Sequence, residues 1–513
     1  MVEHVLAKDE TGVRFSLTAP LILNFKIPQE VLDALETLKK NNFESYLVGG
    51  CVRDLLLSRT PKDWDITTNA LPEEIEKIFP KTVYENTFGT VAVVNEHTED
   101  PILKVIEITP YRLEGKYTDK RHPDEVIFSK KIEDDLKRRD FTVNAMALNP
   151  FSGDIVDLFG GREDLAKKII RTVGDPDERF REDALRLLRA VRFSTELDFA
   201  ISHETAESIF KNAELIKHIS SERIRDEFVK MMQSENPMAG ISMLSRFGLL
   251  KHIIPELEEG IGCEQLGEHV YDVFDHLLHA LGQASAKNWP LHIRLAALFH
   301  DIGKPRTRRF DATKAGGKGK YTFYGHEVVG ARMAAKILER LKFPKDISER
   351  VVSLVRYHMF FSDTETITLS AVRRTIVNVG RENIWDLMQI RECDRVGMKK
   401  KEAPYRLRKY HAMIEEALRA PTSVGMLKLD GAGLKALGIA PGPRMGWILH
   451  ALLDECLEDD TKNNLENLKS RALELDKLSD ADLKTLGEAG KQAKEEKEEE
   501  EVAKLNEKHG VRK

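Results

Sequence analysis

The stretch from residue 46 to residue 70 holds glycine, arginine and aspartate side chains at spacings that could bind a nucleotide phosphate. A short apolar run ends in Gly49-Gly50, and a helical pattern that contains Arg53 follows it. Two glycines let the backbone approach a ligand closely, and a helix N-terminus presents free N–H groups and partial positive charge to phosphate. Taken alone, the two glycines are more typical of a turn that only reverses the chain.

Two aspartates follow this turn at a spacing that favours binding of a divalent cation. Asp63 and Asp65 lead into the strand-like run Ile66-Thr67-Thr68. Because residues i and i+2 of a strand point to the same face, the two carboxylates are expected side by side. Such like charges repel unless a cation lies between them, and Mg²⁺ commonly binds carboxylates together with substrate phosphates. An Asp-x-Asp pair alone is common on surfaces, but the pair after a phosphate-binding turn predicts metal-dependent phosphoryl transfer.

A second set of chemistry-bearing residues lies between residues 276 and 394. His300-Asp301 ends an apolar helical run, and other histidines and an aspartate precede and follow it along predicted helices. Imidazole together with carboxylate suits transition metals, which activate water for phosphate-ester hydrolysis. A lone histidine on a helix usually has no ligand role, whereas an ordered set predicts a metal site. The members of the set are His276, His300, Asp301, His326, His358 and Asp394.

The motifs of the first half of the chain carry a family resemblance. Gly-Gly-x-Val-Arg-Asp at 49–54 followed by Lys-Asp-x-Asp at 62–65 resembles the class II tRNA nucleotidyltransferase/poly(A) polymerase family, within the DNA polymerase beta superfamily. Three further stretches are similar to family motifs in the same order, and the resemblance is dense over residues 20–260. These stretches are 138–145 (RRDFTVNA), 157–165 (DLFGGREDL) and 182–189 (EDALRLLR). The resemblance implies addition of nucleotides to an RNA 3′ end without a nucleic-acid template.

The same resemblance implies a role for each residue that matches a motif. Asp63 and Asp65 would hold Mg²⁺, and Glu107 matches a third catalytic carboxylate, with a surface glutamate at a strand edge as the alternative. Asp183 and Arg186 would read the Watson–Crick edge of the incoming base; the alternative is an exposed, salt-bridged helix. The residues expected to contact the nucleotide are Gly49, Gly50, Arg53, Arg139, Asp183, Arg186, Arg189 and Arg192.

The histidine and aspartate set resembles the HD superfamily of metal-dependent phosphohydrolases. His276, His300-Asp301 and Asp394 match its His…His-Asp…Asp pattern, which implies a divalent transition metal. His326 and His358 would hold a second metal ion or bind phosphate. The alternative is an inherited helical spacer that keeps residual ligands without activity.

The elements that must position these residues divide the chain into an α/β part and an all-helical part. β-like runs alternate with helical patterns up to about residue 160, and nearly every later segment is helical. The predicted fold class is α+β, with a mixed α/β nucleotidyltransferase head (DNA polymerase beta-like) followed by an elongated all-α body that includes the HD domain. The expected strands are 46–48, 90–95, 103–109 and 125–128, and the expected helices are 28–43, 182–194, 204–212, 221–232 and 292–300.

Changes in composition and the position of helix-breaking residues predict six segments along the chain. They are an N-terminal extension (1–25), the catalytic head (26–162), a helical neck with the nucleotide-selecting helix and an RNA-binding region (163–260), the HD domain (261–403), a C-terminal helical tRNA-binding region (404–490) and a charged tail expected to be disordered (491–513).

The composition excludes several classes of protein. No run approaches the roughly 18 apolar residues that span a bilayer, and the first residues lack an apolar signal segment, so a cytoplasmic protein without membrane contact is expected. Four scattered cysteines with no CxxC pair exclude a disulfide scaffold. The net charge of −6 argues against a globally basic nucleic-acid binder. Because the motifs nevertheless imply RNA binding, we expect a narrow basic track on a mildly acidic surface. The oligomeric state is not indicated.

The sequence therefore predicts an enzyme that adds or repairs the 3′-terminal CCA of tRNA from CTP and ATP, with Mg²⁺ and release of pyrophosphate. Its RNA partner would be the acceptor arm and 3′ end of tRNA. A polar loop at 111–126, where the family places a loop that helps switch from C to A addition, favours full CCA addition or A addition over an enzyme that adds only C. The alternatives are a poly(A) polymerase or an enzyme that adds only A and, from another class, a phosphohydrolase whose N-terminal module only delivers RNA.

Overall fold

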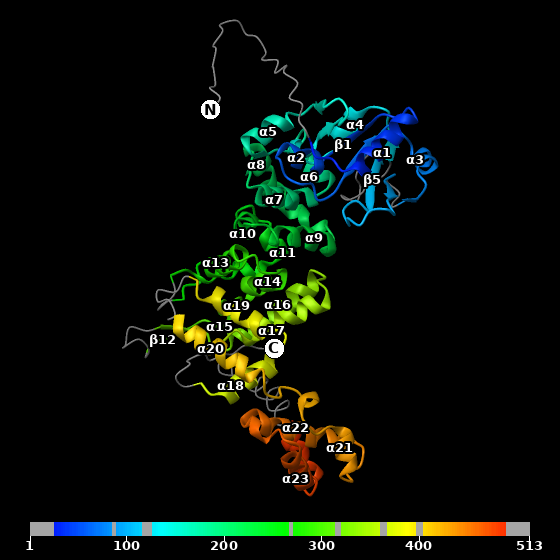
Figure 1. Cartoon of the computed structure of the whole chain (residues 1–513). Helices are drawn as coiled ribbons and strands as arrows, with labels where there is room; N and C mark the ends of the chain where they lie inside the picture. Colours follow the sequence, from blue (N-terminus) through cyan, green and yellow to red (C-terminus); the bar gives the residue numbers. More distant parts are fainter. Residues whose placement is uncertain are drawn as a thin grey trace. The chain divides into compact units, whose positions relative to one another are not determined.

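The chain forms two compact units. The computed structural model (Figure 1) describes residues 25–84, 89–114, 126–265, 270–312, 320–359, 367–396 and 404–488. The first unit comprises the residues up to Arg186 together with Phe199–Ser208, and the second comprises Leu187–Asp198 and the residues from Ile209 onward. The six-segment division predicted from the sequence is finer and stays a prediction. The charged tail and nearly all of the N-terminal extension lie outside the described residues.

The first unit is built on a mixed seven-stranded sheet with the order β3-β4-β5-β2-β1-β8-β9. Its strands are β1 (Ser45–Val48), β2 (Asp65–Thr68), β3 (Thr82–Tyr84), β4 (Val91–Val94), β5 (Val105–Pro110), β8 (Met146–Leu148) and β9 (Ile155–Asp157). β1 is antiparallel to both β2 and β8, whereas β2 and β5 run parallel and place Asp65 opposite Glu107. In β5, Ile106 and Ile108 are fully buried while Glu107 is exposed, so Glu107 projects away from the core.

Short helices and two small ladders complete the first unit. The helices are α1 (Gln29–Lys40), α2 (Gly50–Leu56), α3 (Pro72–Ile78), α4 (Ile132–Lys137), α5 (Gly161–Lys167), α6 (Pro176–Glu182) and, in part, α7 (Leu185–Leu197) and α8 (His203–Asn212). The ladders join β6 (Arg112–Glu114) to β7 (Val126–Phe128) and β10 (Ile169–Ile170) to β11 (Ala200–Ile201). Residues 115–125 of the predicted polar loop lie outside the described residues. The four predicted strands correspond to β1, β4, β5 and β7, although β7 pairs with β6 outside the main sheet.

One predicted helix is wrong at its start. The sequence pattern predicts a continuous helix over 182–194, but α6 ends at Glu182 and α7 begins at Leu185. Between them Asp183 has an extended backbone (φ −136°, ψ 105°), and its carboxylate accepts a hydrogen bond from the N–H of Leu185 at 3.0 Å. Aspartate commonly satisfies the first amides of a helix in this way, so the residue caps α7 instead of lying on its face.

Over its described residues, the second unit is helical apart from one hairpin. The helices named below are α9 (Ser221–Met232), α13 (Val273–Ala286), α14 (Leu291–Phe299), α15 (Lys304–Thr307), α16 (His326–Arg340), α17 (Lys345–Tyr357), α19 (Ile384–Asp394), α20 (Pro404–Ala417) and α22 (Pro443–Glu458). The hairpin joins β12 (Arg309–Asp311) to β13 (Lys320–Thr322). The run from Ile293 to Phe299 is buried throughout, so α14 forms the centre around which the ligand-bearing helices pack. The predicted helices at 221–232 and 292–300 are confirmed as α9 and α14, and the one at 204–212 as α8.

The predicted α+β class is confirmed, with a mixed sheet in the first unit and helices after it. Across the described residues, no helix combines the length and the apolar character needed to cross a membrane.

Candidate active sites in the two units

The glycine turn after β1 lies directly against the charged residues that the sequence predicts for nucleotide chemistry. Gly49 has a φ of +78°, and a Cβ added to it would lie 2.9 Å from Arg139 Nη1 and 3.7 Å from Asp65 Oδ2. A Cβ on Gly50 would lie 3.6 Å from Asp63 Oδ1 and 3.7 Å from Arg53 Nη2. Residues from three separate stretches of the sequence therefore meet at this turn, and the missing side chains leave room for a ligand between them.

The carboxylates at the turn carry more negative charge than the adjacent cations offset. β2 begins at Asp65 while Asp63 lies in the bend before it, so the strand periodicity used to pair them applies only to Asp65, although both face the glycines. Burial first, and then the charges of Asp63 and Glu107, raise the pKa of Asp65 to about 7, against the opposing effect of Arg139. A divalent cation with oxygen ligands would relieve this repulsion, so the donor set fits such an ion. Asp63, Asp65 and Glu107 are less tightly gathered than the potential ligands of the second unit. Among the described residues, the groups of three or more potential ligand atoms that all lie within 4.8 Å of one another are in the second unit.

A buried aspartate that the sequence did not single out holds the paired arginines of the 138–145 motif. Asp135 on α4 is fully buried and accepts hydrogen bonds from Arg138 Nη2 at 2.6 Å and Arg139 Nη2 at 3.1 Å. Burial opposes ionisation, but the two guanidinium groups hold the pKa of Asp135 below its ordinary value. Asp135 therefore positions Arg139 beside Gly49. The spacing of three and four residues on a helix was the signal that could have identified it.

We expect Asp135→Asn to destabilise the first unit by about 3–5 kcal/mol, because the change leaves two partly buried guanidinium groups without their carboxylate. Since the folded-state pKa of Asp135 is lowered, its contribution is fully present above the unfolded-state pKa and is lost as pH falls through the folded-state pKa. Denaturant unfolding at pH 7 and between pH 5 and 3 measures the difference from wild type, which should shrink with acid. The exposed carboxylate of Glu133 on the same helix gives the control, Glu133→Gln. Equal stability of the two variants at pH 7 would contradict this assignment.

The 138–145 and 157–165 motifs also fix the position of Arg53 and the fold around it. Arg53 Nη1 donates to Asn144 Oδ1 at 2.8 Å, and its Nε donates to Asp54 Oδ1 at the same distance. Thr142 Oγ1 donates to Asp164 at 2.6 Å, and Asp157 accepts the N–H of Gly161 at 2.8 Å at the start of α5. The 138–145 motif therefore holds Arg53 beside the turn, and the 157–165 motif supports the 138–145 motif through Asp164.

Two glycines with positive φ differ in what an added side chain would contact. Gly49 and Gly153 have nearly equal positive φ values (+78° and +77°), but a Cβ on Gly153 would meet nothing within 4 Å. We expect Gly153→Ala to lose about 1 kcal/mol of stability from the strained backbone. Gly49→Ala should lose more, because the φ of +78° is combined with a ψ of −131°, a conformation that essentially only glycine adopts. Only Gly49→Ala should also lose nucleotide addition, by roughly 10²-fold, because its Cβ displaces Arg139. Steady-state rates of addition for the two variants test this, and equal rates would rule out a role for the close approach.

The four residues around the start of α7 that are expected to contact the nucleotide are engaged in intramolecular contacts. Arg186 is 8% exposed, and its guanidinium donates to Glu182 Oε2 at 2.6 Å and to the carbonyl oxygen of Arg138 at 3.2 Å. The remaining two arginines belong to the second unit and pair with the buried carboxylate of Glu227. The distances are 3.5 Å from Arg189 Nη1 and 2.7 Å from Arg192 Nε. Nucleotide binding by Asp183 and the three arginines stays a prediction.

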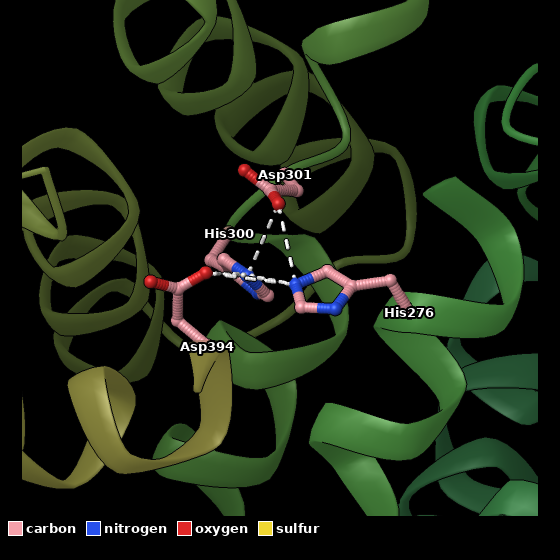
Figure 2. Close-up of side chains that lie close together, drawn as sticks. All are labelled: His276, His300, Asp301 and Asp394. Atoms are coloured by element: carbon pink, nitrogen blue, oxygen red, sulfur yellow. Dashed lines mark hydrogen bonds and ion pairs between the residues drawn. The ribbon is translucent and has the colours of Figure 1, made fainter. Parts of the chain in front are cut away.

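The second predicted set of ligands converges in the second unit (Figure 2). His276 comes from α13, His300 and Asp301 follow α14, and Asp394 ends α19. The two histidine Nε2 atoms are 3.1 Å apart. They lie 3.4 Å from Asp301 Oδ2 and 3.5–3.6 Å from Asp394 Oδ1. All four ligand atoms thus surround one point, as a single metal ion requires.

Asp301 joins this group to a second one. Its Oδ1 lies 3.1 Å from His326 Nε2 and 3.5 Å from His358 Nε2, and these two nitrogens are 3.3 Å apart. Because Oδ2 faces the first group and Oδ1 the second, Asp301 can bridge two metal ions. His326 and His358 are buried and lie where the sequence predicts a second metal or phosphate site.

The backbone orients three of the histidines so that they could bind a metal ion. The Nδ1 atoms of His300, His326 and His358 lie 2.7–2.8 Å from the carbonyl oxygens of the residues three positions earlier. Because a carbonyl oxygen only accepts, each Nδ1 donates to it, and in the neutral ring Nε2 then presents the lone pair. In the neutral rings of His326 and His358, two such lone pairs would face each other 3.3 Å apart and repel unless a cation lay near them. The donor set therefore fits divalent metal ions.

Lys304 contacts this cluster and Gln265 contacts Lys304, and the sequence did not assign either residue a role. Lys304 Nζ lies 2.5 Å from Asp301 Oδ2 and donates to Gln265 Oε1 at 2.7 Å, and both side chains are buried. Although burial opposes it, Lys304 and the histidines hold the pKa of Asp301 well below its ordinary range. The position of Lys304 three residues after Asp301 was the available signal.

Comparisons with known proteins agree with this organisation. Three family models match in order: the poly A polymerase head domain at residues 45–171, a probable RNA and SrmB-binding site of polymerase A at 198–261, and the HD domain at 266–399. The CCA-adding enzyme of Geobacillus stearothermophilus is 46% identical over 287 residues, which are 55% of this chain and 65% of that protein. That of Lactobacillus helveticus is 50% identical over 210 residues, 40% of this chain and 51% of that protein. The chain thus matches about two thirds or less of the length of these curated relatives.

Solved structures extend the likeness over most of the chain. The crystal structure of the Bacillus stearothermophilus CCA-adding enzyme in complex with CTP has a TM-score of 0.64 and 28% identity, and the match covers 87% of this chain and 97% of that one. The Thermotoga maritima CCA-adding enzyme complexed with tRNA has a TM-score of 0.54 at 21% identity, over 88% of this chain and 98% of that one, which supports the fold alone.

The resemblance inferred from the sequence is therefore confirmed. The head and HD models together imply dependence on divalent metal ions. By its motifs, its sheet and its matched domains, the chain carries a poly A polymerase head domain with an HD domain behind it, and it is similar over most of its length to CCA-adding enzymes.

Proposed function

We propose that this chain adds or repairs the 3′-terminal CCA of tRNA, using CTP and ATP and releasing pyrophosphate. The observation that carries the proposal is the meeting of two aspartates and two arginines at the Gly49-Gly50 turn. The identity to CCA-adding enzymes, one of which was solved with CTP, supports this function over a poly(A) polymerase or an enzyme that adds only A.

In this reaction the residues around the turn bind and align the triphosphate. Asp63 and Asp65 would hold Mg²⁺, with Glu107 as a third carboxylate, and Mg²⁺ when bound offsets the charge on the phosphates. The glycines would admit the phosphates, while Arg53 and Arg139 donate to their oxygens. A carboxylate of the set, or a water, would take the proton of the primer 3′-hydroxyl, whose oxygen attacks the α-phosphorus in line with the departing pyrophosphate.

Choice of the base would fall to the segment at the start of α7. Asp183 and Arg186 offer an acceptor and a fork of donors suited to the Watson–Crick edges of C and A. Asp183 caps α7 and Arg186 pairs with Glu182, so reading a base requires these side chains to exchange contacts. Arg189 and Arg192 are likewise proposed to contact the nucleotide.

A nucleotide-resolved assay tests the proposal. Two RNA substrates are used, a tRNA transcript that ends before CCA and a shorter RNA that contains only its acceptor arm. Each is incubated with Mg²⁺ and each labelled nucleoside triphosphate in turn. We expect incorporation from CTP, incorporation from ATP only once C has been added, and none from GTP or UTP. Incorporation from ATP alone would favour the A-adding alternatives.

A second activity, metal-dependent hydrolysis of a phosphoester, is proposed for the HD cluster. The sharing of Asp301 between two buried ligand groups supports it, because paired metals commonly activate water against phosphoesters. In hydrolysis the water oxygen bonds to phosphorus, the ester P–O bond breaks and the leaving oxygen takes a proton. Release of product after loading with Mn²⁺, Co²⁺, Ni²⁺ or Zn²⁺ tests it, and inactivity with every metal would favour an inherited spacer.

A further inference from the structure

The C-terminal end of α4 binds two arginine side chains through backbone carbonyl oxygens. Arg179 Nη1, from α6, donates to the carbonyl oxygen of Lys137 at 3.3 Å, and Arg186 Nη2, from α7, donates to that of Arg138 at 3.2 Å. The last carbonyl groups of a helix lack intrahelical partners and carry partial negative charge, so they favour cations. The end of α4 therefore holds the segment that is expected to select the base.

Arg179 is connected to Arg186 by two further routes. Its own carbonyl oxygen accepts a hydrogen bond from Arg186 Nη1 at 3.2 Å, and its guanidinium group pairs with Glu182 Oε1. The other carboxylate oxygen of Glu182, Oε2, accepts from Arg186 Nη1 at 2.6 Å. One carboxylate thus lies between two guanidinium groups. The Arg179 side chain, which is 15% exposed, completes the connection between α4, α6 and the start of α7.

The same end of α4 sets the position of Arg139 at the glycine turn. Buried Asp135 accepts from Arg138 Nε at 2.9 Å and from Arg138 Nη2 at 2.6 Å, and it also accepts from Arg139 Nη2. The carbonyl that holds Arg186 and the guanidinium that faces Gly49 therefore belong to consecutive residues. One anchored dipeptide thus fixes the spacing between the groups expected to bind the triphosphate and the base.

We propose that Arg179 is a positioning residue for base selection, which ties Arg186 to the end of α4 and so keeps it at a set distance from the phosphate-binding turn. The inference rests on the proposed nucleotide addition and names a determinant of its specificity. In this arrangement Arg186 Nη2 stays on the carbonyl oxygen of Arg138 while Nη1 exchanges Glu182 for the base. Arg179 retains the released carboxylate and offsets its charge.

The position of Arg186 matters because a guanidinium group only donates hydrogen bonds. Cytosine offers it an acceptor at N3, where uracil presents an N–H donor, so a fixed guanidinium favours C over U. Without the Arg179 side chain, Glu182 loses its second cation and competes more strongly for Arg186. The guanidinium is then displaced from the base, and the preference for C falls because displacements of about 1 Å cost much of a directed contact.

A neighbouring arginine on the same helix provides a matched control. Arg181 follows Arg179 by two residues on α6, and its side chain is 57% exposed and lies 3.6 Å from Asp177. Arg179→Met and Arg181→Met each remove one positive charge from α6 and leave a long apolar side chain. Only the first removes a contact with α4.

Rates of addition to a tRNA transcript that ends before CCA test the proposal with the full-length protein and Mg²⁺. We expect Arg179→Met to lower the ratio of kcat/KM for CTP to that for UTP about 10- to 100-fold. Arg179→Lys keeps a cation but lacks the fork that reaches both Glu182 and α4, so its ratio should be intermediate. Arg181→Met should keep the wild-type ratio.

An unchanged ratio in Arg179→Met would overturn the proposal, even if its rates or its stability were lower, because a residue that only supports the fold would slow both nucleotides equally. Thermal unfolding shows whether each variant folds. If Arg179→Met does not fold, the ratio in Arg179→Lys decides, and a wild-type value there overturns the proposal.

Failure of the proposed function is a separate outcome. If wild type adds no nucleotide, the function fails, and equilibrium dialysis with labelled CTP and UTP then measures binding instead of addition. A preference for CTP that is lower in Arg179→Met than in wild type and Arg181→Met still supports the positioning role. The same affinity ratio in all three proteins overturns it.

Discussion

Asp63→Asn and Asp65→Asn are each expected to reduce nucleotide addition by roughly 10²- to 10³-fold or more, while leaving phosphoester hydrolysis at the HD cluster unchanged. Each substitution removes an oxygen ligand and a negative charge from the turn where the triphosphate would bind. Because the pKa of Asp65 is raised by burial and by the charge of Asp63, Asp63→Asn should also lower the pKa of Asp65.

Single-turnover addition of CMP to a tRNA lacking CCA measures this effect, and phosphatase assays on the same preparations measure the other activity. Asp33→Asn, an exposed aspartate on α1 of the same unit, provides the control and should retain full addition. Wild-type rates in both Asp63→Asn and Asp65→Asn would support the alternative in which the head only delivers RNA to a phosphohydrolase.

Asp301→Asn is expected to abolish phosphoester hydrolysis and to remove both metal ions, because this carboxylate faces both ligand groups. A substitution of a residue that belongs to only one ligand group should affect only the metal ion bound by that group. His326→Ala should lose the second ion and keep the first, and Asp394→Asn should weaken the first.

Elemental analysis after dialysis against a single metal measures how many metal ions each variant binds. We expect about two ions per chain in wild type, about one in His326→Ala and almost none in Asp301→Asn. His450→Ala, an exposed histidine on α22, is the control. Wild-type metal content in Asp301→Asn would show that the carboxylate does not bridge, and a parallel loss of CMP addition would show that the head depends on the HD cluster.

The sequence was sufficient to predict those site residues that are close along the chain or lie within an ordered motif. The Gly49-Gly50 turn, the Asp63 and Asp65 pair and the six HD residues meet as expected, because each motif carries its own spacing and local element. The sharing of Asp301 between two groups was not predicted, because it depends on how α16 and α17 pack beside α14.

The residues that anchor the site were harder to predict, because their partners come from tertiary packing. Asp135 and Glu227 resemble ordinary helix-surface acids in the sequence, yet both are buried beneath arginines that the motifs single out. The break at Asp183 was missed because the apolar periodicity of the region continues across it, while one carboxylate-to-amide hydrogen bond ends the first helix and begins the next. Short strands such as β8 and β9 contain too few residues for period-two alternation to be recognised.

Net charge is a poor guide to RNA binding by this chain. The total of −6 counts acids that neutralise buried or partly buried arginines, as Asp135 and Glu227 do, and acids that are proposed to hold metal ions. It therefore describes the whole chain and says little about the surface that would bind RNA.

Sequencing of reaction products tests the central claim most directly. A tRNA transcript that ends before CCA is incubated with CTP alone, with ATP alone and with both, and its 3′ ends are read. We predict two added C residues with CTP alone, no addition with ATP alone, and CCA ends with both nucleotides. Products that contain only A, or unextended ends in all three reactions, would contradict the assignment of this chain as a CCA-adding nucleotidyltransferase.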